Sequence, residues 1–191
     1  MINEDRKIRN QFERMEKRKQ KVYTLVTPLS EEMYLFQPSN TSWSVGQVAN
    51  HLYLSEAASF AYLKKKMSYP DTIPSYSIQS WRAYYLTKFI LLSPIKVKAP
   101  PAIDMGTDKP VLPPQQLDGK WNELRTELKS FIDGHYPQFR SKLVYNHPFA
   151  GRMTMLQMLM FFNDHLDHHI RQMKKIMRAV GQISNQQERK E

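Results

Sequence analysis

Apolar residues recur at steps of three and four residues along most of the chain, which is the spacing of amphipathic helices. Between residues 4 and 26, Ile8, Phe12, Met15 and Val22 follow this spacing among charged residues. Similar patterns lie within 42–67, 78–93, 115–132 and 154–180. No segment alternates apolar and polar residues as a half-buried strand does. The pattern therefore predicts an all-α protein.

Capping residues indicate where several of these helices begin. Ser44 with Gln47, and Thr154 with Gln157, have the spacing of a capping box, in which each side chain bonds the other residue's backbone N–H. Ser30 is a candidate cap for a short helix. Gly181 is expected to end the last helix. The stretches 37–43 and 144–152 are expected to be loops.

Proline divides the chain unevenly. Six of the 12 prolines lie within 94–114, which therefore cannot form a regular helix. This length exceeds that of ordinary loops and is typical of segments that are functional or mobile. Four long helices joined by such a crossover segment predict a four-helix bundle. We expect one domain over 1–181 and a polar C-terminal tail over 182–191.

The composition excludes several kinds of chemistry. The chain has no cysteine, so it has no disulfides, no thiolate metal ligands and no cysteine nucleophile. Its charged N-terminus does not resemble a signal peptide, and its most apolar run, 153–162, is too short to span a bilayer. We therefore expect a cytoplasmic protein without a membrane-spanning segment.

The net charge of +10 raises the question of a nucleic-acid partner. Residues 1–21 and 171–191 together supply +8 of this charge and contain almost no aromatic residues. A groove for single-stranded nucleic acid combines basic with aromatic side chains, so solvated helix faces are the simpler interpretation. Nucleic acid is not an expected partner.

Three of the six histidines lie between residues 165 and 169. His165 and His169 are four residues apart, so on a helix they share one face, whereas His168 is rotated by about 100° and belongs to the flank. His51 borders the apolar stripe of another helix. Three imidazoles from two helices can bind a divalent ion and leave positions open, as in catalytic zinc sites. The alternative is that these histidines only satisfy one another or the backbone.

Other polar residues near the histidines are candidates for orienting ligands or substrate. Gln47 lies one turn before His51, Gln172 lies three residues after His169, and Asp164 directly precedes His165. The glutamate of the H-E-x-x-H motif is missing, because Leu166 follows His165. We therefore assign no catalytic residue beyond a metal-bound water.

Three stretches in order, WSVGQVANHL (43–52), HPFAGRMTMLQML (147–159) and HLDHHIRQM (165–173), resemble the DinB/YfiT-like superfamily. The resemblance spans roughly residues 5–180. It implies an up-down-down-up four-helix bundle in which His51, His165 and His169 bind zinc or nickel. Here the 70–114 segment is longer and richer in proline than a minimal member needs, so the mouth of the site is expected to differ.

The resemblance and the histidines allow several functions. An ion held by three histidines lowers the pKa of its bound water from about 15.7 towards 7, which predicts a metal-dependent hydrolase acting on a small molecule. The family also includes S-transferases that use low-molecular-weight thiols such as bacillithiol, and DNA-damage-inducible proteins without known activity. A non-catalytic binding module and a purely structural bundle, for instance a homodimer, stay open as alternatives.

Overall fold

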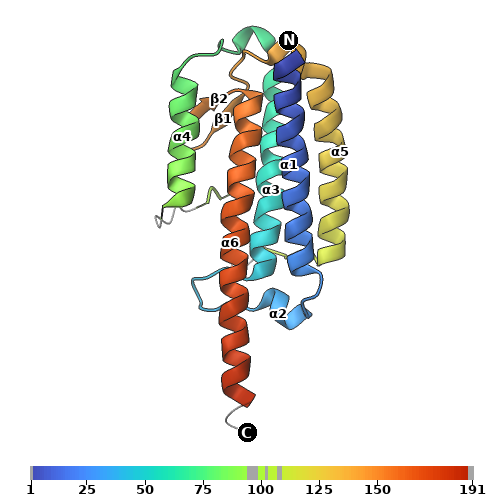
Figure 1. Ribbon diagram of the computed structural model, residues 1–191, viewed down its shortest axis with the longest axis vertical. Helices are drawn as coiled ribbons and strands as arrows, with labels where there is room; N and C mark the ends of the chain where they lie inside the picture. Colours follow the sequence, from blue (N-terminus) through green and yellow to red (C-terminus); the bar gives the residue numbers. More distant parts are fainter. Residues whose placement is uncertain (1, 94–98, 102, 107–108, 189–191) are drawn as a thin grey trace.

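Four long helices form the body of the protein in a computed structural model, which describes residues 2–93, 99–101, 103–106 and 109–188. They are α1 (Ile2–Val26), α3 (Val45–Met67), α5 (Pro114–Phe139) and α6 (Met155–Glu188). Helices α1 and α6 run in one direction and α3 and α5 in the other (Figure 1). The predicted four-helix bundle, with its up-down-down-up order, is confirmed.

The parallel pair α3 and α5 requires a connection that returns along the whole bundle (Figure 1). It contains a 3₁₀ turn η1 (Pro70–Thr72) and the helix α4 (Gln79–Leu92), which packs beside α6. The described part of the proline-rich segment contains turns and extended backbone until α5 begins at Pro114. Positions 94–98, 102, 107 and 108 of that segment lie outside the described residues.

The predicted caps are present. Ser44 and Gln47 exchange the two bonds of a capping box at the start of α3. Thr154 and Gln157 form the same pair at the start of α6. Ser30 accepts the N–H of Met33 at the start of the short helix α2 (Glu31–Leu35). Local side-chain chemistry therefore determines where these helices begin.

The expectation of a loop over 144–152 is wrong. Strands β1 (Tyr145–His147) and β2 (Gly151–Met153) pair antiparallel, with Tyr145 opposite Met153. Each strand has only three residues, which is too short for the alternation that identifies strands in a sequence. Gly151 adopts φ +99°, which a glycine tolerates and which allows the tight reversal.

The expected helix end at Gly181 is also wrong, because α6 continues to Glu188. Glycine ends a helix when it adopts a left-handed conformation, whereas Gly181 keeps a helical one. The residues after it include several glutamines and Glu188, which are good helix formers. Most of the segment predicted as a tail, 182–191, is therefore helical, and 189–191 lie outside the described residues.

The core is apolar but contains one buried ion cluster. Arg125 of α5 donates to both carboxylate oxygens of Glu56 on α3, at 2.6 and 2.7 Å, and to Glu16 on α1 at 2.7 Å. The indole of Trp121 also donates to Glu56. Burial lowers the pKa of Arg125, but the Glu56 and Glu16 charges outweigh this and raise it. The cluster joins three helices through charges that compensate one another.

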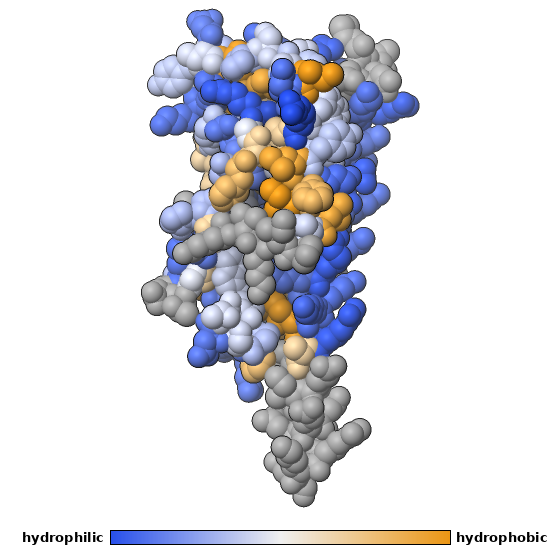
Figure 2. Space-filling view, turned by 90° about the vertical axis from the view of Figure 1, so that its left-hand side faces the viewer, coloured by the Kyte–Doolittle hydropathy of each residue, from blue (hydrophilic) through white to orange (hydrophobic). Residues whose placement is uncertain are grey.

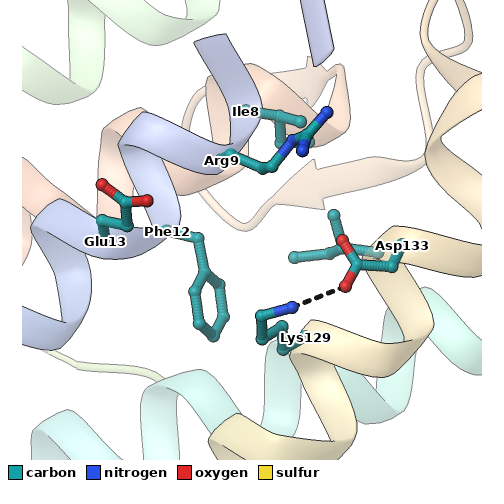
Figure 3. Close-up of a pocket in the computed structure, with 7 residues that line it drawn as sticks. Ile8, Arg9, Phe12, Glu13, Lys129 and Asp133 are labelled. Carbon is teal, nitrogen blue, oxygen red and sulfur yellow. Dashed lines mark hydrogen bonds and ion pairs between the residues drawn. The ribbon is translucent and has the colours of Figure 1, made fainter. Parts of the chain in front are cut away.

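The surface has two further features. Hydrophobic side chains gather on the face that α4 presents to solvent (Figure 2), where Tyr85, Phe89 and Leu92 are more than half exposed. A hollow of about 70 Å³ lies between α1 and α5 (Figure 3), at the Lys129–Asp133 ion pair. None of the predicted site residues lines this hollow.

Among the described residues, no helix has the length and apolar character needed to cross a membrane.

The Arg125 cluster yields a stability prediction. Arg125→Met removes the partner of a carboxylate that is only 2% exposed, so the free energy of unfolding should fall by about 3–5 kcal/mol. Lys129→Met, a matched change in an exposed ion pair of the same helix, should cost less than about 1 kcal/mol. Urea denaturation measures both, and similar losses for the two variants would contradict the assignment.

Candidate metal centre

His51 lies on the inner face of α3, in the second turn after the Ser44 cap. Its neighbours Val48 and Leu52 are fully buried in the core, which turns the histidine inward as well. The His51 side chain is only 4% exposed. The apolar stripe of α3 therefore determines where this imidazole points.

His165 and His169 lie one turn apart on the face of α6 that enters the bundle. Both are 8% exposed, and Leu166 and Met173 beside them are fully buried. The ring of Phe161 stacks on His165, with ring centres 5.4 Å apart. The predicted pairing of these two histidines on one helix face is thus what the structure shows.

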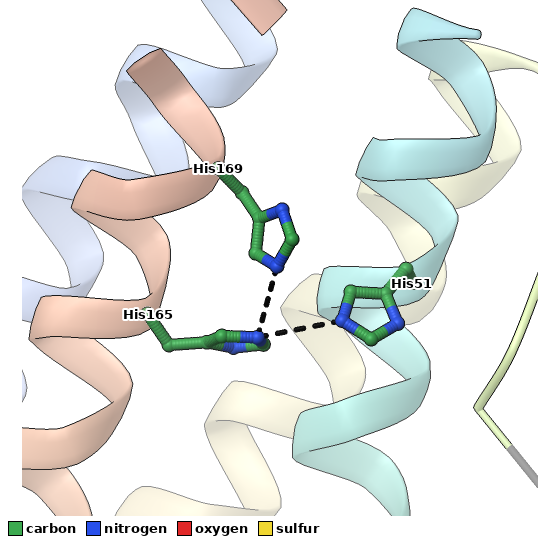
Figure 4. A group of neighbouring side chains, drawn as sticks. All are labelled: His51, His165 and His169. Carbon is green, nitrogen blue, oxygen red and sulfur yellow. Dashed lines mark hydrogen bonds between the residues drawn. The ribbon is translucent and has the colours of Figure 1, made fainter. Parts of the chain in front are cut away.

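The three imidazoles converge between α3 and α6 (Figure 4). Nε2 of His165 lies 3.4 Å from Nε2 of His51 and 3.0 Å from Nε2 of His169. One nitrogen from each ring lies within 4.8 Å of the others. Ligands placed tetrahedrally around zinc at about 2.05 Å lie roughly 3.3 Å apart, so these spacings suit a single ion.

Hydrogen bonds determine the tautomers of two of the rings. Nδ1 of His51 donates to the carbonyl oxygen of Ile103 at 2.8 Å. Nδ1 of His169 donates to Oε1 of Gln172 at 2.7 Å. Because both acceptors lack a proton, each Nδ1 carries the hydrogen. In the neutral rings each Nε2 therefore carries a lone pair that faces the common point. Outside the three rings, the one described group within hydrogen-bond distance of these atoms is the Ser55 hydroxyl, which lies 3.5 Å from Nε2 of His51, at the outer limit of a hydrogen bond.

This arrangement is unsatisfied without a further group. If His165 carries its proton on Nε2, this N–H can donate to the lone pair of His51 or of His169, but not to both. If the proton of His165 is on Nδ1 instead, the lone pairs of all three Nε2 atoms face one another. Nδ1 of His165 is buried and has no hydrogen-bond partner among the described residues. A divalent cation accepts three lone pairs at once, so the donor set fits a metal ion.

Protonation of the histidines does not replace a metal ion in satisfying these lone pairs. Burial and the neighbouring imidazoles lower the pKa of His165 and of His169 well below the ordinary value of 6.5. Burial also lowers the pKa of His51, although the Ile103 carbonyl and the Asp104 charge act against it. The three rings are therefore neutral at neutral pH, as metal binding requires.

Of the three polar residues predicted to orient ligands or substrate, only Gln172 forms a hydrogen bond with the histidine group. It bonds His169 and so orients its ring. Gln47 instead bonds Ser44, Gln37 and the carbonyl of Met105, while Asp164 accepts the hydroxyl of Tyr84 on α4. Gln47 and Asp164 are thus engaged in holding a loop and a helix. His168 lies on the flank, as predicted, and donates to Leu91 of α4.

Three features beside the histidines were not predicted. They are the Ile103 carbonyl, the carboxylate of Asp104 that follows it, and the ring of Trp43, whose centre lies 4.9 Å from that of His51. Ile103 acts through its backbone, and the 103–106 segment is about fifty residues from His51 along the chain. Only its position within the long proline-rich crossover could have drawn attention to it.

His147 anchors the β-hairpin beside the site. Its Nδ1 accepts the N–H of Phe149, and its ring packs edge-on against Phe161 at 4.7 Å. Burial lowers the pKa of His147 to about 4. This histidine is therefore a neutral structural residue of the loop.

The comparison with known families establishes what class of protein this is. The model of the DinB superfamily matches residues 14–173. The chain belongs to the DinB superfamily. No curated protein gives a significant match to the sequence.

One solved structure supports the fold. It is described as "YfiT from Bacillus subtilis is a probable metal-dependent hydrolase with an unusual four-helix bundle topology". The two chains are 17% identical, and the match covers 91% of this chain and 87% of the other with a TM-score of 0.57. At this identity the likeness concerns the fold alone.

His147 provides a pH prediction. Because its pKa is about 4 in the folded chain and 6.5 when unfolded, the stability gained by keeping it neutral is present above pH 6.5 and is lost as the pH falls towards 4. We expect an NMR titration midpoint near 4 for this ring. His147→Gln should reduce the loss of stability between pH 7 and 4.5, and an unchanged loss would count against this role.

Proposed function

We propose that His51, His165 and His169 bind a divalent metal ion and that the protein is a metal-dependent hydrolase of a small molecule. The observation that carries the proposal is the convergence of three Nε2 atoms in a buried group where Nδ1 of two rings is already bonded. The description of the YfiT structure as a probable metal-dependent hydrolase supports it. When bound, the ion would act as a Lewis acid and lower the pKa of a coordinated water towards about 7.

The chain itself supplies orientation. The Ile103 carbonyl and Gln172 each hold one ring with its Nε2 turned to the common point. Such partners also raise the basicity of the ligating nitrogen. Because the group offers three ligands, an ion bound there would have a position open for water or substrate, as in catalytic zinc sites.

Zinc or nickel is the ion that we propose, because neutral imidazoles suit both and the group contains no carboxylate, which calcium and magnesium prefer. No cysteine is present to select a thiophilic ion. The proposed role in hydrolysis is the same for zinc and nickel.

Metal content tests the first part of the proposal. Protein purified without an affinity tag and reconstituted with zinc or nickel should contain about one ion per chain. His51→Ala, His165→Ala and His169→Ala should each lose it, while His135→Ala should keep it, because this histidine bonds Phe131 within α5. Elemental analysis after gel filtration measures the content. Full occupancy in all three variants would refute the site.

Gln172 allows a finer test. Gln172→Leu removes the acceptor for His169 Nδ1 but no ligand, so it should weaken metal affinity by about 10–100-fold. The measurement is competition with a chromophoric chelator. Gln116→Leu is the control, since Gln116 is exposed on α5 and bonds no histidine of the group, and the metal affinity of this variant should stay at the level of the unmodified chain.

Activity tests the second part. Metal-loaded protein should hydrolyse simple esters or amides, and His169→Ala should reduce the rate to background. The same screen includes low-molecular-weight thiols with electrophiles. Thiol transfer without hydrolysis would replace the proposed reaction by the S-transferase alternative.

A homodimer, a cytoplasmic location and the lack of a nucleic-acid partner stay predictions.

A further inference from the structure

Two groups contact the imidazole of His51 from outside the pair α3 and α6. Trp43 lies just before α3, and its ring is inclined by 48° to that of His51 with centres 4.9 Å apart. The second group is the 103–106 segment, whose Ile103 carbonyl holds His51 Nδ1. Neither group is one of the three predicted metal ligands. Both therefore border the proposed metal centre without binding the ion.

The indole of Trp43 differs from the other two in the chain. Trp81 donates its indole N–H to Tyr76, and Trp121 donates to Glu56 in the core. The indole N–H of Trp43 has no hydrogen-bond partner among the described residues, and its side chain is partly exposed. The ring packs against the core and against His51 and stays partly exposed, so an aromatic surface borders the centre.

Asp104 is held in place by the residues on either side of it. Ile103 is bonded to His51, and Met105 is fully buried with its carbonyl bonded to Gln47 Nε2 at 2.8 Å. The N–H of Asp104 donates to Pro100. The half-buried Asp104 carboxylate has no hydrogen bond or ion pair with any described residue. The Asp104 carboxylate does not come within 4.8 Å of the ligand nitrogens of all three histidines, so it is not a fourth ligand.

The charge of Asp104, which acts on His51, is opposite in sign to the net charge of the protein. The net charge of the chain is +10. Among the described residues, Asp104 is the one residue other than a histidine whose charge shifts the pKa of a ring in the group, namely that of His51. No described lysine or arginine shifts the pKa of these rings. A negative group thus lies near His51, although the protein as a whole is basic.

We propose that Trp43 and Asp104 form a subsite for a cationic group of the substrate beside the metal centre. The inference rests on the proposed function for the identity of the reacting site. A tryptophan face is the strongest aromatic partner for an ammonium ion, within about 6 Å of the ring centre. The Asp104 carboxylate, which has no partner among the described residues, adds a charge attraction that is strong where water is partly excluded. The favoured substrates are therefore amine-bearing or quaternary ammonium compounds.

A matched pair of probes tests the subsite directly. Choline and 3,3-dimethylbutan-1-ol have the same shape and hydroxyl group, but only choline carries a charge, and its quaternary nitrogen cannot bind a metal ion. Titration calorimetry, with tryptophan fluorescence as a second readout, should give about tenfold tighter binding of choline. This preference is expected in both the zinc-loaded and the metal-free protein.

Substitutions separate the subsite from other roles. Asp104→Asn and Trp43→Leu should each reduce the preference for choline by about tenfold and leave metal content unchanged. Trp43→Phe retains an aromatic face and should keep part of the preference. The controls Asp133→Asn and Trp81→Phe lie outside the proposed subsite and should keep all of it. Far-UV circular dichroism verifies that each variant is folded.

Equal binding of the two probes by the unmodified protein would overturn the proposal, and so would a full preference in Asp104→Asn. If Asp104 acted instead as a proton acceptor in the reaction, Asp104→Asn would slow hydrolysis of neutral and cationic esters equally and leave choline binding intact. A protein that prefers choline but binds no metal would contradict the proposed function alone. Loss of the preference with normal metal binding would contradict the subsite alone.

Discussion

The centre of this structure depends on the cost of burying three neutral imidazoles whose lone pairs face one another. Each ring is less than 10% exposed, and two of the three Nδ1 groups are bonded outward. The three Nε2 atoms point at one place between α3 and α6 (Figure 4). A bundle interior tolerates such an arrangement when a ligand satisfies it, because unpaired polar groups are costly to bury. The metal proposal follows from this requirement.

The remainder of the bundle keeps those rings in position. The Arg125 cluster joins α1, α3 and α5, and Arg18 of α1 bonds Asp167 of α6 at 2.6 Å. On the other side, Asp164 and His168 attach α4 to α6. One stretch of α6 therefore points two histidines inward and uses the residues next to them to hold the neighbouring helices. The same turns of α6 therefore supply both the predicted metal ligands and the contacts that hold the neighbouring helices.

The proline-rich crossover has a functional place in this arrangement. A parallel pair of helices needs a long return connection, and the described part of that connection lies against the site. Ile103 orients His51, Met105 is buried, and the carboxylate of Asp104 between them has no partner in the described part of the chain. A segment that the topology requires thus also borders the centre. This explains why the longest irregular part of the chain lies close to the chemistry.

The sequence by itself determined the helices, their caps and the three histidines, because these depend on spacings within one helix. A four-residue step places His165 and His169 on one face regardless of the rest of the chain. It did not reveal the β-hairpin, since three-residue strands carry too little pattern, nor the continuation of α6 past Gly181. Only the tertiary structure decided that Ile103 and Trp43 contact His51 and that the charge of Asp104 acts on it. Contacts through a backbone carbonyl, or across fifty residues of chain, leave no periodic signal in the sequence.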